Sequence, residues 1–206
     1  MDQEHLEEDI EELRAEGRAR IRKELAEMRA RKPAGRTGLV IVYTGDGKGK
    51  TTAALGVLLR AWGQQMRVVM LQFLKSQTDT GEMRAAQRLG IEMLPLGQGA
   101  IWESEHPEQD RAFAQACWQQ CRAKIESQQY DVVIMDEMTY ALNYKWLDLE
   151  EVLAVLRQRD PQLHIIITGR NAPAALIEYA DLVTEMREIK HPYKTQGILE
   201  QQGIDF

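Results

Sequence analysis

The chain has 206 residues, of which 44% are hydrophobic and 28% charged, the composition of a globular protein large enough to bury one sizeable core. Its formal net charge of −6 argues against a surface built mainly to neutralise a nucleic-acid backbone. No apolar run approaches the roughly 18 residues that a transmembrane helix needs, and the acidic N-terminus is unlike a secretory leader. We therefore expect a cytoplasmic protein that binds neither nucleic acid nor membranes.

Residues 1–32 differ from the rest of the chain, because they are highly charged and carry only a narrow apolar stripe. The stripe has a helical spacing and consists of Leu6, Ile10, Leu13, Ile21, Leu25 and Met28. We predict a helical arm and linker over 1–37, with Pro33 and Gly35 ending the helix, and one main domain over 38–206. The stripe is too thin to form a core, so the arm either docks on the domain or a neighbouring subunit, or stays solvated.

The main domain alternates short apolar runs rich in branched residues with longer amphipathic stretches. This pattern is typical of a parallel sheet covered by helices on both faces. The expected strands are 39–43, 68–73, 91–96, 132–135, 164–168 and 182–185. The expected helices are 50–62, which is apolar all round, 82–89, 108–127, 149–159 and 174–179. We predict an α/β fold of the RecA-like P-loop NTPase class, with a mostly parallel sheet of about six strands.

The two cysteines, Cys117 and Cys121, lie four residues apart in one of the expected helices. Residues at this spacing share a helix face. The arrangement suits two buried thiols better than a disulfide framework or a four-ligand zinc site.

The stretch TGDGKGKT, residues 44–51, runs directly from the first expected strand into the first expected helix. Its glycines let the backbone point successive N–H groups at an anion, and the helix start adds the positive end of its dipole. Lys50 supplies a positive charge to phosphates, and Thr51 supplies a hydroxyl for magnesium. Thr44 stands where the motif usually begins with glycine. The flanking strand and helix nevertheless indicate a site for a nucleoside triphosphate.

The apolar strand VVIMDE ends in two carboxylates, Asp136 and Glu137. We expect it to neighbour the first strand in the sheet, so that its carboxyl end lies near the phosphate loop. Asp136 is then a candidate ligand of the metal or of its waters. Glu137 can orient a water for hydrolysis, bind the metal or hold a substrate hydroxyl, and the spacing does not choose among these roles.

Further motifs occur along the rest of the domain. In chain order, the motifs are TGDGKGKTTAALG, GQGAIWE, VVIMDEMTYALNY, LDLEEVL, IIITGRNAP and the ending EIKHPYKTQGILEQQGIDF. In order and spacing they resemble the P-loop ATP:corrinoid adenosyltransferases of cobamide synthesis and salvage. The resemblance covers about 38–206, and a helical N-terminal arm is also similar to that family.

The resemblance implies transfer of the 5′-deoxyadenosyl group of ATP to the Co(I) centre of a reduced corrinoid, with release of intact triphosphate. Cobalt is then the nucleophile, in agreement with the lack of an evident nucleophile and base pair in the sequence. ATP would lie on the loop reversed relative to most P-loop proteins, with its 5′-carbon facing the second substrate. The resemblance further implies Mg²⁺ or Mn²⁺, a flavoprotein or other reductant, and a homodimer.

The expected site residues form three groups. For ATP they are Thr44, Gly45, Asp46, Gly47, Lys48, Gly49, Lys50, Thr51, Thr52 and Arg170, with Lys48 and Arg170 either phosphate contacts or ordinary surface cations. For catalysis they are Lys50, Thr51 and Glu137, and for the metal Thr51, Asp136 and Glu137. For the corrinoid they are Ala100 and Trp102, in a loop where the family motif usually reads Gly-x-Gly-Phe-x-Trp. Ala100 in place of phenylalanine leaves open how the lower corrin face is sealed.

Other functions remain open on the sequence alone. The loop and Glu137 also fit a RecA-like ATPase, although the acidic charge disfavours a nucleic-acid motor. A nucleoside kinase is a third reading, but related thymidine kinases carry a four-cysteine zinc site that two cysteines cannot build. Loss of activity through Ala100 would leave a corrinoid or nucleotide sensor. His191 is expected to be a hydrogen-bonded surface or hinge group rather than a metal ligand.

Overall fold

The computed structural model describes residues 3–30, 38–74, 79–97 and 107–205, and its internal contacts divide the chain into two units, Met1–Arg36 and Thr37–Phe206. The first unit contains one helix, α1 (Gln3–Ala30), on which Leu13 and Ile21 of the predicted stripe are exposed. The predicted corrinoid residues Ala100 and Trp102 lie outside the described residues. All further structural statements concern the second unit.

The second unit is built on one sheet in which every strand pairing is parallel. Its strands are β1 (Val40–Thr44), β2 (Val68–Gln72), β3 (Glu92–Pro95), β4 (Val132–Asp136), β5 (His164–Thr168) and β6 (Leu182–Glu185). The strand order is β3-β2-β4-β5-β1-β6. The central strands β2 and β4 are buried at every position, which explains why they read as continuous apolar runs.

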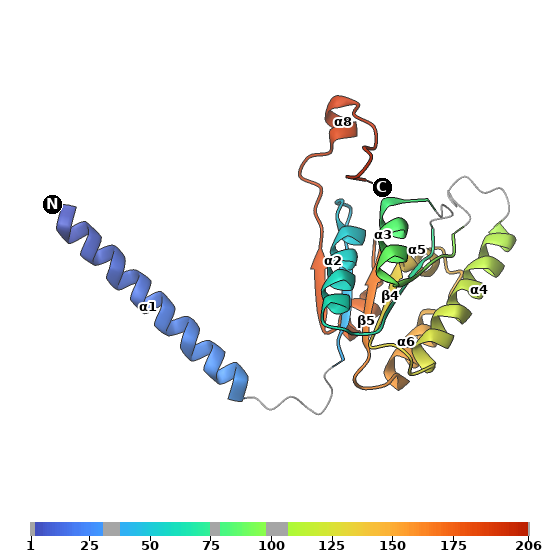
Figure 1. Ribbon diagram of the computed structural model, residues 1–206, viewed down its shortest axis with the longest axis horizontal. Coiled ribbons are helices and arrows are strands. Elements are labelled where there is room, and N and C mark those ends of the chain that lie inside the picture. The colour runs from blue at the N-terminus through green and yellow to red at the C-terminus, as the bar shows by residue number, and fades with distance from the viewer. Residues whose placement is uncertain (1–2, 31–37, 75–78, 98–106, 206) are drawn as a thin grey trace. The chain divides into compact units, whose positions relative to one another are not determined.

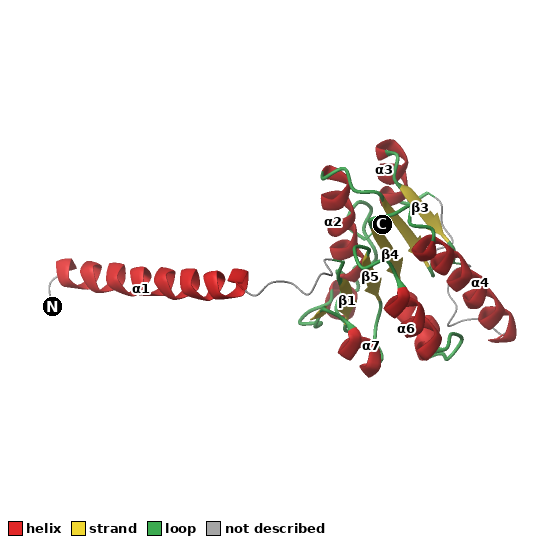
Figure 2. Cartoon of the chain, turned by 90° about the horizontal axis from the view of Figure 1, so that it is seen from below, coloured by secondary structure: helices red, strands yellow, loops and turns green. Residues whose placement is uncertain are grey.

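Helices cover both faces of the sheet (Figures 1 and 2). On one face α2 (Lys50–Gly63) and α3 (Gly81–Leu89) pack on one set of alternating strand residues, including Met70 and Ile134. On the other face, α4 (Pro107–Glu126), α5 (Met138–Asn143), α6 (Leu149–Gln158) and α7 (Ala174–Tyr179) pack on the other set, including Leu71 and Met135. A last helix, α8 (Pro192–Gln196), follows β6.

The predicted α/β fold is confirmed, and each predicted strand and helix is found with bounds within one or two residues. The sequence did not predict α5 and α8, which have only six and five residues. Although α2 carries apolar residues all round, its buried residues are Lys50, Ala54, Leu58 and Ala61, and Leu59 is 55% exposed.

The interpretation of the two cysteines as buried thiols is confirmed. Both are free and lie on the face of α4 that packs into the core beside Trp118, another residue of that helix. Burial raises the pKa of Cys117 to about 11, and it also raises the pKa of Cys121.

The carboxyl ends of the parallel strands meet at one edge of the sheet, where ligands bind in folds of this type. The expectation that β4 neighbours β1 is wrong, because β5 lies between them. The end of β4 still reaches the phosphate loop, since Thr51 at the start of α2 and Thr168 at the end of β5 both contact Asp136.

Candidate functional site

The phosphate loop between β1 and α2 is held against the chain that leaves β6. Gly47 N donates to Met186 O at 2.7 Å. Gly45 has φ 94°, and a Cβ there would lie 2.4 Å from the same Met186 oxygen. Gly49 has φ 106° immediately before α2 begins. Glycine is therefore required in this loop both for its left-handed backbone and for its close approach to residue 186.

Lys50 is only 6% exposed and turns its side chain back into the phosphate loop. Its Nζ donates to Gly45 O and to Gly47 O, each at 2.8 Å. Burial lowers the pKa of Lys50, Glu137 acts to raise it, and Arg170 lowers it further. The loop thus holds a partly desolvated cation where a phosphate oxygen can replace backbone carbonyls as its partner.

Asp136, fully buried at the end of β4, joins residues from three elements. Thr51 Oγ1 donates to its Oδ1 at 3.0 Å, and Thr168 Oγ1 donates to the same oxygen at 2.6 Å. Gln72 Nε2 approaches the other carboxylate oxygen at 3.5 Å. The structure thereby brings together the hydroxyl and carboxylate that the sequence predicts as metal ligands, although they lie 85 residues apart.

Glu137 stands between β4 and α5 with a left-handed backbone, φ 60° and ψ 22°. This conformation is uncommon for a residue with a side chain and occurs often at functional sites. Its backbone N–H donates to Thr168 Oγ1 at 2.9 Å. One turn later, Tyr140 also faces the site, and burial raises its pKa, with Glu137 acting in the same direction.

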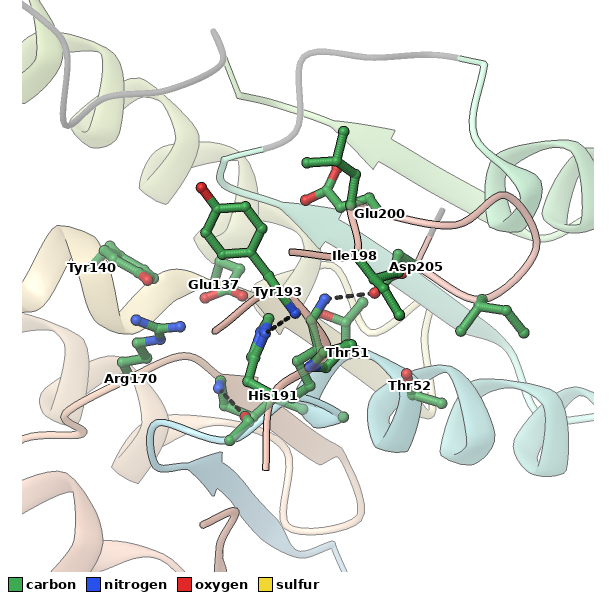
Figure 3. Close-up of a pocket in the computed structure, with 17 residues that line it drawn as sticks. Thr51, Thr52, Glu137, Tyr140, Arg170, His191, Tyr193, Ile198, Glu200 and Asp205 are labelled. Carbon is green, nitrogen blue, oxygen red and sulfur yellow. Dashed lines mark hydrogen bonds and ion pairs between the residues drawn. The ribbon is translucent and has the colours of Figure 1, made fainter. Parts of the chain in front are cut away.

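Arg170 is placed by the loop after β5, which is fastened to α5. Thr139 Oγ1 and Asn143 Nδ2 both donate to Arg170 O, at 2.7 and 3.0 Å. Gly169 permits this approach, because it has φ 139° and a Cβ there would lie 2.0 Å from Thr139 Oγ1. The Arg170 side chain is exposed and lies near Glu137 and Tyr140 in Figure 3.

These groups line one cavity of about 1020 Å³ (Figure 3). Of the predicted site residues, those that line it are Gly47, Lys48, Gly49, Lys50, Thr51, Thr52, Glu137 and Arg170. Thr44 and Asp136 are buried and do not line it, and Asp46 is exposed beside the loop. The structure therefore gathers eight of the predicted site residues, from the segments that follow β1, β4 and β5, around one cavity.

The opposite wall of the cavity was not predicted. It comes from the C-terminal segment and is lined by His191, Pro192, Tyr193, Ile198, Leu199, Glu200, Ile204 and Asp205. His191 caps α8, since its Nδ1 accepts from Tyr193 N at 3.3 Å, which confirms the interpretation of His191 as a hydrogen-bonded group. Tyr140 was missed because α5 was not predicted: with a helix beginning after Glu137, residue 140 falls one turn along it.

In the part of the chain that the structure describes, no helix is both long enough and apolar enough to cross a bilayer.

Residues 36–206 match the family model for the ATP:corrinoid adenosyltransferases BtuR/CobO/CobP. The corrinoid adenosyltransferase of Escherichia coli is 37% identical over 184 residues, or 89% of this chain and 93% of that protein. A corrinoid adenosyltransferase of Sinorhizobium sp is 40% identical, covering 82% of this chain and 80% of the relative. Corrinoid adenosyltransferase CobA of Salmonella typhimurium is 38% identical, covering 82% and 86%.

Among solved structures, domain III of the replication initiation protein DnaA from Thermotoga maritima aligns with 79% of this chain and 60% of that chain. The identity is 15% and the TM-score 0.37, a likeness that carries no argument about function. The family match spans nearly the whole second unit, including all the cavity residues named above. The chain therefore belongs to the ATP:corrinoid adenosyltransferase family.

Proposed function

We propose that this chain transfers the 5′-deoxyadenosyl group of ATP to the Co(I) centre of a reduced corrinoid and releases triphosphate. The observation that carries the proposal is a cavity in which the phosphate loop forms one wall and the C-terminal segment another. At about 1020 Å³ the cavity lies at the upper end of the usual range for small-molecule sites, and it leaves room beside one nucleotide. Membership of the family supports the same reaction.

In the proposed reaction an electron pair on cobalt attacks the 5′-carbon of ATP. A Co–C bond forms, the bond between the 5′-carbon and its oxygen breaks, and that electron pair leaves on the triphosphate. The loop N–H groups, the start of α2 and Lys50 offset the charge of this leaving group. Lys48 and Arg170 lie at the same cavity and add to the positive charge. The chain supplies orientation and electrostatics, and no side chain has to act as a nucleophile.

Magnesium, or manganese in its place, fits the residues at the end of β4. Thr51 Oγ1 and the Asp136 carboxylate are hard oxygen donors held 3.0 Å apart beside the phosphate loop. Thr51 would hold the ion, and Asp136 would hold it directly or through waters. When bound, the ion supplies further positive charge to the triphosphate. Glu137 has no water to activate in this reaction, so its proposed role is to bind the metal or a substrate hydroxyl.

The test is incubation of the full chain with ATP, Mg²⁺ and chemically reduced cobinamide or cobalamin. The expected product is an adenosylated corrinoid, recognised by its absorption spectrum and by its loss on illumination. The variant Lys50→Ala, assayed in parallel, should lose most of this activity. If the wild type instead hydrolyses ATP with no corrinoid product, the RecA-like ATPase alternative replaces the proposal.

The residue at position 100 gives a second test at the corrinoid loop. Single-turnover adenosylation by the wild type is compared with that of Ala100→Phe, which restores the aromatic residue of the family motif. Faster turnover in the variant is expected if Ala100 weakens the seal of the lower corrin face. Equal rates would mean that Trp102 or a neighbouring side chain already supplies it.

We further propose that the protein acts in the cytoplasm as a homodimer and receives a Co(I) corrinoid through a flavoprotein or another reductant. The apolar stripe of the N-terminal arm, in which Leu13 and Ile21 are exposed, supports a subunit contact. Sedimentation of the full chain and of a chain without residues 1–37 tests this. A full chain that sediments as a monomer at micromolar concentration would rule the homodimer out.

A further inference from the structure

Residues 186–205 form the cavity wall that the sequence did not predict, and we call this segment the strap. The strap is tied to the phosphate loop at both of its ends. At its start, Met186 O accepts from Gly47 N at 2.7 Å. At its end, the Asp205 carboxylate contacts Lys48 Nζ at 2.5 Å, across 157 residues of sequence. The position of the strap is therefore set relative to the loop that holds the triphosphate.

The Asp205 carboxylate is held more firmly than an ordinary surface carboxylate. Its side chain is 19% exposed, against 51% for Lys48. Its second oxygen accepts from Gln201 N at 2.9 Å, and Asp205 N donates back to Gln201 O at 2.9 Å. The ion pair with Lys48, followed by the Gln201 bond, lowers the pKa of Asp205, so this contact remains ionic at neutral pH. The last turn of the strap is thus fastened to the phosphate loop through Asp205.

Between the two anchors the strap presents apolar side chains to the cavity. Ile198 lines it with Leu199, which is 70% exposed, and Ile204, which is 81% exposed. Pro192 and Tyr193 of α8 extend this surface. Several large apolar groups exposed side by side at a cavity mark a surface that a ligand covers. The facing wall is cationic and polar. It therefore suits a negatively charged part of a ligand, whereas the strap suits an apolar part.

We propose that Asp205 is a positioning residue, which through Lys48 holds the strap so that its apolar wall binds the corrinoid macrocycle. The inference rests on the proposed function. The phosphate loop already accounts for the triphosphate, and adenine is a small planar ring. A corrin ring with its methyl-bearing periphery is broad enough to cover a wall that extends from Pro192 to Ile204. Because Lys48 belongs to both the loop and the ion pair, the same contact fixes the apolar wall relative to the loop that holds the triphosphate.

The test compares three single variants of the full chain with the wild type by steady-state kinetics, varying ATP and reduced corrinoid separately. Asp205→Asn removes the ionic contact at constant size. Ile204→Ser removes part of the apolar wall and leaves the ion pair. Glu126→Gln is the matched control, because it breaks an exposed ion pair of the same kind, 2.7 Å from Arg122 on α4, and neither residue lines the cavity.

Asp205→Asn and Ile204→Ser are each expected to raise the corrinoid KM about tenfold, because a wall that is no longer preorganised binds less well. The ATP KM should change less than about twofold, and Glu126→Gln should match the wild type. The inference fails if the corrinoid KM is unchanged, if the ATP KM rises as much, or if only kcat falls. These failures are distinct from a failure of the proposed function, in which the wild type itself forms no adenosylated corrinoid.

Discussion

Burial destabilises the protonated form of Lys50 in the free protein, and a bound triphosphate would stabilise it. In the free protein its cation is desolvated and donates to two backbone carbonyls of the loop. Burial is the largest influence on its pKa and lowers it, while Glu137 offsets part of that effect. A bound triphosphate stabilises the protonated form, so ATP binding must raise the pKa again.

This change in the pKa of Lys50 makes ATP affinity depend on pH. ATP affinity should fall as pH rises through the lowered pKa of free Lys50, at a lower pH than for an ordinary lysine. Calorimetric measurement of the ATP Kd between about pH 7.5 and 10 checks this. Lys50→Arg is the control, because its guanidinium does not titrate in that range. Parallel curves for wild type and variant would contradict the assignment of the charge to Lys50.

The thiols of α4 lie away from this chemistry and should be inert. With a pKa of about 11, Cys117 is roughly one part in a thousand thiolate at pH 8, and Cys121 is buried more deeply. We predict no reaction of the native protein with a thiol-specific disulfide reagent over minutes, and reaction of both thiols in guanidinium chloride. Rapid reaction of the native protein would show that the core around α4 opens readily.

At the scale of elements, the site depends on short connections that follow the strands. The loop after β5 is fastened to α5 through Thr139 and Asn143, and this contact directs Arg170 to the cavity. Gly169→Ala would place a methyl group on Thr139 Oγ1 and also strain the left-handed backbone. We expect a loss of about 2–4 kcal/mol in the free energy of unfolding.

Gly90→Ala serves as the control for this prediction. Gly90 also has a left-handed backbone, with φ 68°, but a Cβ there meets nothing within 4 Å. Its loss should be about 1 kcal/mol, the conformational cost alone. Urea unfolding measures both variants, and equal losses would show that the contact with Thr139 adds nothing.

The strands, the phosphate loop and the short helices differ in how well the sequence predicts them. Buried parallel strands such as β2 and β4 were predictable because they have to be apolar on both faces. Lys50 and Thr51 were predictable because a phosphate loop constrains nearly every position of a short stretch. Helix α5 was not, because its six residues follow β4 without a capping side chain, whereas α7, of the same length, follows Pro173; Tyr140 was missed with α5. The contact of Asp205 with Lys48 depends on the path of the strap, which no local pattern encodes.

For the whole molecule, we predict that residues 38–206 fold without the arm. Among the residues whose burial the structure describes, every member of the two hydrophobic clusters belongs to the second unit. A chain of residues 38–206 should therefore unfold cooperatively, with a midpoint in urea close to that of the full chain, and should bind ATP within about twofold of its affinity. A shortened chain that aggregates or no longer binds ATP would show that the arm is part of the nucleotide site.

In the proposed reaction, the phosphate loop holds a leaving group rather than a phosphate that is transferred. The most direct measurement is phosphorus NMR of the products formed from ATP during turnover with reduced corrinoid, with the adenosylated corrinoid quantified in the same sample. The proposed reaction predicts one molecule of inorganic triphosphate for each adenosylated corrinoid, because only the bond at the 5′-carbon breaks. ADP and orthophosphate as the main products, without adenosylated corrinoid, would contradict it.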